Sequence, residues 1–333
     1  MSVTLDDIAQ KVGVAKTTVS VVLNNKPSRI PESTRQQIRE AAKELNYKAS
    51  YAGSVLAKGK SFNLGMVCGD IQSPFFSEIA SNALIVAEAK GYHMMILATK
   101  WDFRKELECL ESLITGRCDG VMMFSASLTP ETEQYRYVVN TKYPLVVIGQ
   151  DEAIPQCITQ LQSDWHCGMN EAIDYLHNKG HEVIGFVGRT VSDGTQNKHR
   201  KRIAFLESCR EQSVGTVEFD CDISYESAVE LGKKLANKAN RPTALVVYSD
   251  QIAIGVIRGL VSSGISVPQQ CAVIGIDGTE IGKYLSPALT TISQDIPGIV
   301  NKTVDLLLKM INGEEVTPSE NFLSTKLIIR ESA

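Results

Sequence analysis

Lys16, Thr17, Ser20 and Val21 have the residue types and the spacing of a surface that reads DNA. A helix beginning near residue 16 would carry them on the outward side of its N-terminal half, which enters the major groove in a helix-turn-helix motif. Lysine, threonine and serine can hydrogen-bond to base edges and phosphates, whereas Val21 could contact only a thymine methyl. These side chains are therefore candidate base and phosphate readers.

A second set of polar and aromatic residues follows apolar runs that are typical of buried strands. The set comprises residues 70–76, Asp164, residues 189–202, Asp250 and Asp277. Ligands of α/β folds bind beyond the carboxyl ends of the strands, so these loops could line a cleft. Each residue taken singly could instead cap a helix or order a loop.

The sequence has no recognisable catalytic or metal-binding signature. Glycine-rich phosphate motifs, the G-x-S-x-G elbow and H-E-x-x-H are absent at strand-to-helix turns. Eight cysteines lie after residue 60 without a C-x-x-C pair, which is typical of reduced structural thiols. His177 and His181 are four residues apart, but Gly180 predicts the end of the helix that would align them. We expect no enzyme activity, no cofactor and no metal.

Composition and charge indicate a globular chain with two regions of opposite sign. The 333 residues are 43% hydrophobic and 22% charged, which excludes disordered, collagen-like and disulfide-stapled classes. Residues 1–60 hold ten basic and five acidic residues, whereas the remainder holds 24 and 33. A basic module on an acidic body favours nucleic-acid binding. No apolar run could span a membrane and the N-terminus is acidic, so we expect a cytoplasmic protein.

Two short helices are predicted on either side of Gly13. Thr4 and Asp7 have the spacing of a capping box, and helical periodicity follows over residues 5–12. Gly13 supplies the positive φ that a tight turn favours, and a second helical stripe covers residues 14–23. The pattern predicts a helix-turn-helix, with a generic helical hairpin as the alternative.

Pro31 predicts the start of a third helix that completes a small core and carries Arg35 and Arg39 on its outer side. Residues 48–60 follow, rich in small side chains and too short to be helical by themselves in water. They indicate a linker or a marginal helix in which Leu56 is an exposed apolar side chain.

Beyond residue 61, short apolar runs alternate with amphipathic stretches. The runs include NLGMVC, YHMMILAT, DGVMMF, VIGFVG, TALVVYS and CAVIGID. Repeated βα units predict parallel sheets with helices on both faces. The predicted fold is a small all-α helix-turn-helix domain followed by an α/β core.

These segments resemble the lactose-repressor (LacI/GalR) family of bacterial transcription regulators over essentially the whole chain. The likeness rests on VTLDDIAQKVGVAKTTVSVVLN, ELNY and VLAKGK, and on SPFFSEI, SDQIAIG, IGID and PALTTISQD. It implies a periplasmic-binding-protein-like core of two subdomains with parallel sheets, crossed three times by the chain and closing on a small effector. The implied boundaries are a helix-turn-helix domain at 1–47, a hinge at 48–60 and a core at 61–333, divided into an N-subdomain (about 61–162 and 295–322) and a C-subdomain (about 163–294 and 323–333).

For DNA binding, the resemblance implies a hinge that becomes helical on the operator and a leucine, Leu56, that wedges into the minor groove. Ala15, Ala49 and Gly53 depart from the family pattern. The residues predicted to contact DNA are Thr4, Lys16, Thr17, Thr18, Ser20, Val21, Asn24 and Leu56.

For the effector, the resemblance places residues 75–76 in an apolar wall and makes Asp277 a hydrogen-bond acceptor. The family motif whose arginine reaches the effector corresponds to residues 201–205, so either Lys201 or Arg202 fills that role. The predicted effector-binding residues are Phe75, Phe76, Asp164, Lys201, Arg202, Asp250 and Asp277.

Together these features predict a repressor that binds a palindromic operator as a homodimer and responds to a small effector. Gly149 and Gln150 stand where many relatives carry an acid or an aromatic residue, so the effector is open between a sugar-like molecule and a nucleobase. The chain ends at IIRESA without the leucine-rich tail of tetrameric members, so a dimer is expected. A solute-binding protein without a DNA role is the alternative, against which the first 60 residues argue.

Overall fold

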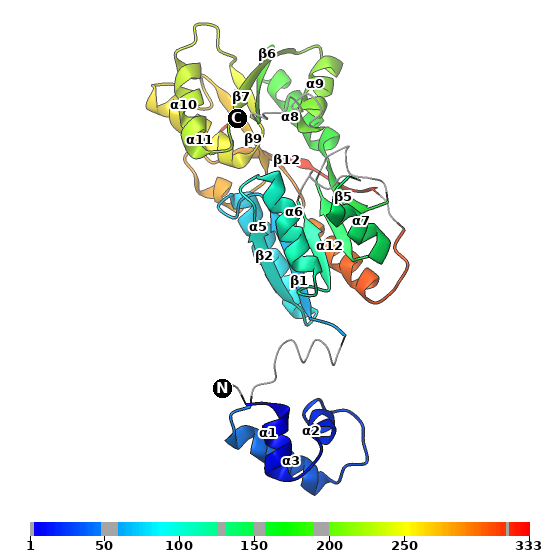
Figure 1. The fold of residues 1–333 in the computed structure, drawn as a ribbon. Helices are drawn as coiled ribbons and strands as arrows, with labels where there is room; N and C mark the ends of the chain where they lie inside the picture. The colour runs from blue at the N-terminus through cyan, green and yellow to red at the C-terminus, as the bar shows by residue number, and fades with distance from the viewer. Residues whose placement is uncertain (1–2, 48–58, 125–130, 150–156, 190–199, 318–319) are drawn as a thin grey trace. The chain divides into compact units, whose positions relative to one another are not determined.

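The computed structural model describes residues 3–47, 59–124, 131–149, 157–189, 200–317 and 320–333 (Figure 1). The chain divides into two compact units, Met1–Ser61 and Phe62–Ala333. Leu56, Ala49, Gly53 and Gln150 lie outside the described residues, so the sequence predictions on the hinge stay predictions.

In its described part, the first unit is a bundle of α1 (Leu5–Val12), α2 (Lys16–Leu23) and α3 (Glu32–Glu44). The predicted capping box is present, because the Thr4 hydroxyl accepts from Asp7 N at 3.3 Å and Thr4 N donates to Asp7 Oδ2 at 2.7 Å. Gly13 turns the chain at φ 76°. The helices bury Ile8, Ala9, Val19, Val22, Ile38, Ala41 and Ala42. This arrangement confirms the predicted helix-turn-helix.

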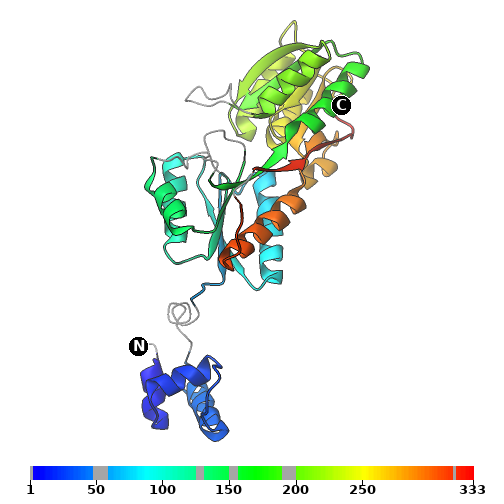
Figure 2. The same ribbon diagram turned by 90° about the vertical axis from the view of Figure 1, so that its right-hand side faces the viewer.

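The described strands of the second unit form two separate sheets (Figures 1 and 2). Sheet A, in the order β11-β5-β4-β3-β1-β2, contains β1 (Asn63–Cys68), β2 (His93–Ala98), β3 (Gly120–Met123), β4 (Leu145–Ile148), β5 (Thr159–Asp164) and β11 (Glu320–Ser324). Sheet B, in the order β12-β10-β9-β8-β6-β7, contains β6 (Val183–Arg189), β7 (Gly215–Cys221), β8 (Ala244–Val247), β9 (Ala272–Asp277), β10 (Thr290–Ser293) and β12 (Lys326–Ile328).

Helices cover both faces of each sheet, as the βα pattern predicts. Sheet A packs between α5 (Pro74–Ala89) with α12 (Ile296–Ile311) and α6 (Phe103–Ile114) with α7 (Glu133–Thr141). Sheet B packs between α8 (Trp165–Asn178) with α9 (Arg200–Glu211) and α10 (Tyr225–Ala236) with α11 (Asp250–Ser262). Each half thus has its own two-sided apolar core, and the predicted α/β fold class is confirmed.

Within the described residues, the chain passes between the halves three times: from β5 to α8, from β10 to α12, and from β11 to β12. Sheet A pairs its strands in parallel, whereas β12 runs antiparallel to β10, a departure from the purely parallel sheets that we expected. β12 follows β11 after the single residue Thr325, and its first residue, Lys326, pairs with Ser293 at the end of β10, so it runs against that strand.

Candidate functional site

The N-terminal end of α2 is exposed. Lys16 and Thr17 begin the helix, and its N-cap Ala15 makes no side-chain hydrogen bond. Lys16 Nζ lies 2.7 Å from Asp6 Oδ2, but both side chains are more than half exposed, so this ion pair is weak. Lys16, Thr17 and the uncapped first turn are therefore available to a polyanion.

The other predicted DNA-binding residues are less open. Thr18, Ser20, Val21 and Asn24 are half-buried, and Asn24 Nδ2 donates to Ser20 O at 2.9 Å. Thr4 is exposed, but its hydroxyl donates to Asp7 Oδ2 at 2.8 Å. The structure thus places Thr18, Ser20 and Val21 on α2 and Asn24 at its C-cap, whereas Thr4 caps α1.

Arg35 corrects an expectation, because it does not lie on the solvated face of α3. Its side chain is 14% exposed, with Nε donating to Ile30 O at 3.2 Å and Nη2 to Ser28 Oγ at 2.7 Å. Arg39 is 50% exposed and lies 3.4 Å from Glu32. Arg35 therefore braces the loop between α2 and α3, whose carbonyl groups need donors that periodicity does not reveal.

An aromatic cluster lies at the carboxyl ends of β1, β2 and β3. Phe75 and Phe76 open α5, and their rings lie 6.1 Å and 5.2 Å from that of Phe124. The Trp101 ring lies 5.5 Å from Phe76. We call Phe75, Phe76, Trp101 and Phe124 the aromatic cluster. Phe76 and Phe124 are buried, and the half-buried Phe75 and Trp101 offer an apolar surface suited to stacking against a ring.

Sequence analysis missed Trp101, which is placed by tertiary packing. Lys100 and Trp101 have φ values of 55° and 63°, where side-chain-bearing residues are uncommon. Lys100 N donates to Gly69 O at 2.6 Å, and a Cβ on Gly69 would lie 2.6 Å from the Trp101 ring. The indole therefore packs directly on the Gly69 backbone. A glycine immediately after a buried strand was the available signal.

A polar cluster, formed by Lys201, Asp277, Asp250 and Gln294, lies at the carboxyl ends of β8, β9 and β10. Lys201 Nζ donates to Asp277 Oδ1 at 3.2 Å and to Tyr248 O at 3.0 Å, and both charged side chains are 9% exposed. Gln294 Nε2 donates to Asp277 Oδ1 at 2.9 Å. Burial raises the pKa of Asp277, and Lys201 opposes that increase. The buried charges of Lys201 and Asp277 are thus stabilised by each other and by hydrogen bonds from within the protein.

Asp250 joins this cluster from the N-terminus of α11 but is fully buried. Its Oδ2 accepts from Thr279 N at 2.7 Å and Thr279 Oγ1 at 2.8 Å, and its Oδ1 accepts from Thr291 Oγ1 at 2.6 Å. Burial, with Asp277 nearby, raises the pKa of Asp250 to about 7. Its carboxylate thus faces protein groups rather than an open surface.

Arg202 and Asp164 have other partners. Arg202 Nε and Nη2 donate to Glu218 of β7 at 2.5 Å and 2.7 Å, whereas the neighbouring Lys201 points to Asp277. Asp164 Oδ1 accepts from His166 N at 3.1 Å and caps α8. The geometry brings Lys201, Asp250 and Asp277 together, and Phe75 with Phe76, but leaves Arg202 and Asp164 in other contacts.

Among the contacts that connect the sheet A half to the sheet B half in the described residues, two were not predicted and lie close to the two clusters. The Arg189 guanidinium at the end of β6 lies 4.6 Å from the centre of the Trp101 ring. Glu78 Oε1 on α5 accepts from Glu280 N, the first residue of the short helix η2 (Glu280–Tyr284), at 2.7 Å. Burial raises the pKa of Glu78, and the hydrogen bond from Glu280 N opposes that increase. The helix that carries Phe75 and Phe76 is thus hydrogen-bonded directly to η2.

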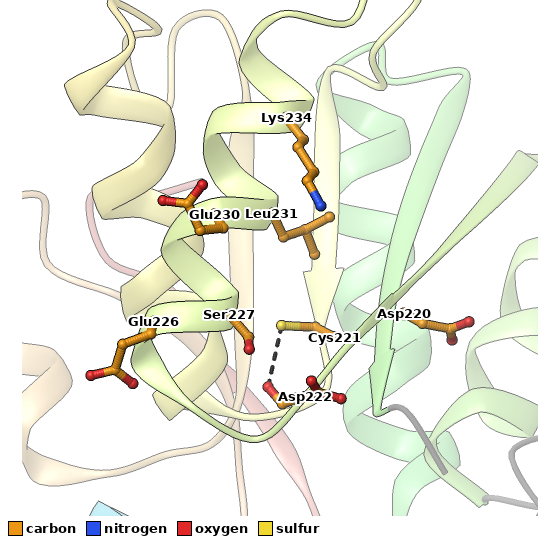
Figure 3. Close-up of a pocket in the computed structure, with 8 residues that line it drawn as sticks. All are labelled: Asp220, Cys221, Asp222, Glu226, Ser227, Glu230, Leu231 and Lys234. Carbon is orange, nitrogen blue, oxygen red and sulfur yellow. Dashed lines mark hydrogen bonds between the residues drawn. The ribbon is translucent and has the colours of Figure 1, made fainter. Parts of the chain in front are cut away.

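A separate hollow of about 360 Å³ lies beside β7 and α10 (Figure 3). Its lining includes four acidic residues, Asp220, Asp222, Glu226 and Glu230, and none of the predicted effector residues. Within the described part of the chain, no three histidine, cysteine or acidic residues are grouped so as to hold a metal ion. The chemistry of the polar and aromatic clusters makes them the stronger candidate site.

Comparison with known proteins places this geometry in a family. Residues 4–50 match the model of bacterial regulatory proteins of the lacI family, and residues 173–333 match a periplasmic binding protein-like domain. The chain is 28% identical to catabolite control protein A of Priestia megaterium, covering 100% of this chain and 99% of that protein. The HTH-type transcriptional repressor PurR of Edwardsiella ictaluri is also 28% identical, with 99% and 96% covered. The chain belongs to the LacI family.

Solved structures support the same LacI-family fold. The lac repressor dimer bound to operator and the anti-inducer ONPF has a TM-score of 0.84 at 24% identity, covering 100% of this chain and 99% of that chain. A LacI regulator from Lactobacillus casei with bound Tris has a TM-score of 0.69 at 28% identity, covering 82% and 97%. As a LacI-family protein, the chain is a DNA-binding transcriptional regulator and not an enzyme. In the described regions, no helix is long and apolar enough to cross a membrane.

Arg35→Ala is expected to lower the free energy of unfolding of the N-terminal unit by about 1.5–3 kcal/mol, because hydrogen bonds from a charged donor are lost. Amide exchange of α1 to α3 in the full chain measures the change. Arg39→Ala is the matched control, and we expect it to change stability by less than about 0.5 kcal/mol. Equal losses in the two variants would contradict the bracing role of Arg35.

The raised pKa of Asp250 predicts a pH dependence of stability. Between the unfolded pKa of 3.8 and the folded pKa of about 7, the folded state binds the proton more tightly, so stability falls as pH rises. This residue contributes at most about 1.4 kcal/mol per pH unit. Urea unfolding from about pH 4 to 7 should therefore show a less negative slope for Asp250→Asn than for the wild type. Parallel profiles would count against a raised pKa.

Proposed function

We propose that this LacI-family regulator is a cytoplasmic repressor that binds a palindromic operator as a homodimer under the control of a small effector. Residues 1–47 would bind DNA, residues 48–60 would form the hinge with Leu56 as its wedge, and residues 61–333 would form the core. Within that core, the proposed N-subdomain covers about 61–162 and 295–322 and the C-subdomain about 163–294 and 323–333.

The exposed start of α2 carries the DNA-binding part of the proposal. Lys16 and Thr17 stand at the end of a helix that lacks a side-chain cap, in a region with twice as many basic as acidic residues. A helix N-terminus and a lysine both favour phosphate, and threonine can also reach base edges. The lac repressor structure bound to its operator supports the analogy.

The chemical class of effector that we propose follows from the different chemistry of the aromatic cluster and the polar cluster. The aromatic cluster offers ring faces, and the Lys201–Asp277 pair offers a donor and an acceptor. Trp165 lies 4.7 Å from Lys201 Nζ, and its buried Nε1 has no hydrogen-bond partner in the described structure. A sugar-like molecule, with hydroxyl groups and an apolar ring face, fits this combination best, and a nucleobase is the alternative. One related regulator, CelR, was solved with cellobiose.

Exposed apolar side chains support the homodimer. Leu84 and Ile85 on α5 are 46% and 68% exposed, and Ile281 and Tyr284 on η2 are 45% and 78% exposed. Neighbouring exposed apolar side chains, such as Leu84 with Ile85, are typical of interaction sites when they form a patch. We propose that a second copy of the chain covers them.

Operator binding should weaken steeply as salt concentration rises, because neutralised phosphates regain counterions. Lys16→Ala and Thr17→Ala should change which bases are tolerated, each good base contact being worth about 1–3 kcal/mol of discrimination. Fluorescence anisotropy with inverted-repeat DNA libraries measures both effects. Lys43→Ala removes the same charge from α3 and serves as the control, with base preference unchanged. Affinity that does not depend on salt would refute the proposal.

A thermal-shift screen of sugars, sugar phosphates and purines should identify the effector, since a ligand at 100 times its Kd stabilises by about 2.7 kcal/mol. With that ligand, Lys201→Met should abolish the effect on operator affinity, whereas Arg202→Met should retain it. These adjacent residues form a matched pair, because Arg202 contacts Glu218 instead of Asp277. A full response in a folded Lys201→Met variant would remove Lys201 from the site.

A further inference from the structure

Asp250 collects hydrogen bonds from the segments that follow β9 and enter β10. Its Oδ2 accepts hydrogen bonds from the backbone N–H and the hydroxyl of Thr279, and its Oδ1 accepts one from the hydroxyl of Thr291. Thr291 Oγ1 in turn accepts from Gly278 N at 3.2 Å. The backbone N–H groups of the two residues after Asp277 are thus tied to Asp250, one through Thr291 and the other directly.

The backbone held in this way is strained at Asp277. This residue has a φ of 129° and is followed by Gly278 at 79°. A side-chain-bearing residue in such a region costs free energy and persists where surrounding contacts fix it. The hydrogen bonds to Gly278 and Thr279 supply those contacts. The Asp277 carboxylate itself accepts from Lys201 Nζ and Gln294 Nε2.

The sequence makes room for the buried carboxylate at Gly275, because a Cβ there would overlap Asp250 Oδ1. Asp250 and Thr291 are both fully buried, so neither side chain offers a surface to a ligand. A carboxylate supplies acceptors on both of its oxygens, which matches the donors that converge on it. Burial of the Asp250 carboxylate costs free energy, and the hydrogen bonds from Thr279 and Thr291 offset that cost.

We propose that Asp250 is a positioning residue: with Thr291 and Thr279 it holds the backbone after β9 so that the Asp277 carboxylate meets Lys201 and the effector. The inference rests on the proposed effector role of Asp277. It assigns Asp250 a role different from the direct effector contact predicted from the sequence. It also explains why a fully buried acid stands beside an ion pair that already contains a carboxylate.

We call the hydrogen bonds that join Asp250 to Thr279 and, through Thr291, to Gly278 the clamp. Hydrogen exchange of the full-length protein, measured by mass spectrometry, tests the clamp without any effector. Thr291→Val removes the hydroxyl at nearly constant shape and breaks the link between Asp250 and Gly278 N. We expect exchange in the peptide covering 276–282 to rise about tenfold or more, since Gly278 N loses its acceptor and the bond from Thr291 to the buried Asp250 is lost. The β6 peptide should keep its wild-type rate. Asp250→Ala should produce the same local change or a larger one.

Thr291→Ser is the matched control, because it keeps the hydroxyl and should exchange like the wild type. Unchanged exchange at 276–282 in both Thr291→Val and Asp250→Ala would overturn the clamp. A uniform rise across the sheet B half would overturn it as well, because it would show a general loss of stability. If Asp250→Ala does not fold, the two Thr291 variants still decide the question.

A second measurement separates this inference from the proposed function. With the ligand found by the thermal-shift screen, Thr291→Val should weaken binding about tenfold or more, and Thr291→Ser should not. Local loosening without a change in ligand affinity would refute the positioning role while leaving the clamp. If ligand affinity is unchanged in Lys201→Met as well, the proposed effector site itself fails.

Discussion

The buried ion pair between Lys201 and Asp277 is the interaction about which the sheet B half is arranged. An ion pair removed from water is stable only when its geometry and additional hydrogen bonds repay the desolvation of both charges. Here the partners come from separate elements: α9 supplies the ammonium, β9 the carboxylate, Tyr248 a carbonyl and Gln294 an amide. The order of the strands is what brings these groups to one edge. A site built this way is specified by the whole half of the molecule and not by one motif.

Gln294 extends this network beyond sheet B. Its side-chain oxygen accepts from Ser163 Oγ, at the end of β5, at 2.7 Å. The same glutamine therefore contacts the ion pair and the strand that leaves sheet A. Together with Arg189 on Trp101 and Glu280 N on Glu78, this gives the two halves polar contacts that need no ligand. Such contacts stabilise this arrangement of the halves without a ligand, and a ligand would shift it only by binding another arrangement more tightly.

Local patterns in the sequence predicted the helices, the capping box at Thr4 and the alternation of strands, because these depend on neighbours within a few residues. The choice between Lys201 and Arg202 depended on the phase of α9, which a degenerate motif left open and the contacts to Asp277 and Glu218 now separate. Arg35 was wrongly placed because its partners lie in an irregular loop. Trp101 was missed because its left-handed backbone follows from packing on Gly69. The contacts that place Lys201, Arg202 and Trp101 are distant in the sequence. Those of Arg35 are five and seven residues away, but they lie in a loop without helical periodicity, so residue spacing did not reveal them.

Asp250 shows the same limit in another form. Both Asp250 and Asp277 are acids at strand ends, and their positions in the sequence favour the same role for each. Burial distinguishes them, since the oxygens of Asp250 are taken up by Thr279 and Thr291. Residue type and position thus predicted where the site lies. The hydrogen-bond partners distinguish Asp277, which we propose contacts the effector, from Asp250, which we propose positions it.

The three passages between the halves have a mechanical consequence. In the described residues, the links after β5, after β10 and between β11 and β12 run side by side in the topology, each joining the same two bodies. A single link would let the bodies swivel freely, whereas parallel links must twist in concert. The relative motion is thereby confined to a narrow path, much as a door on several hinges has one axis. A ligand that contacts both halves would favour one position along that path. Because the halves move as whole bodies, even a small ligand could change the structure far from where it binds.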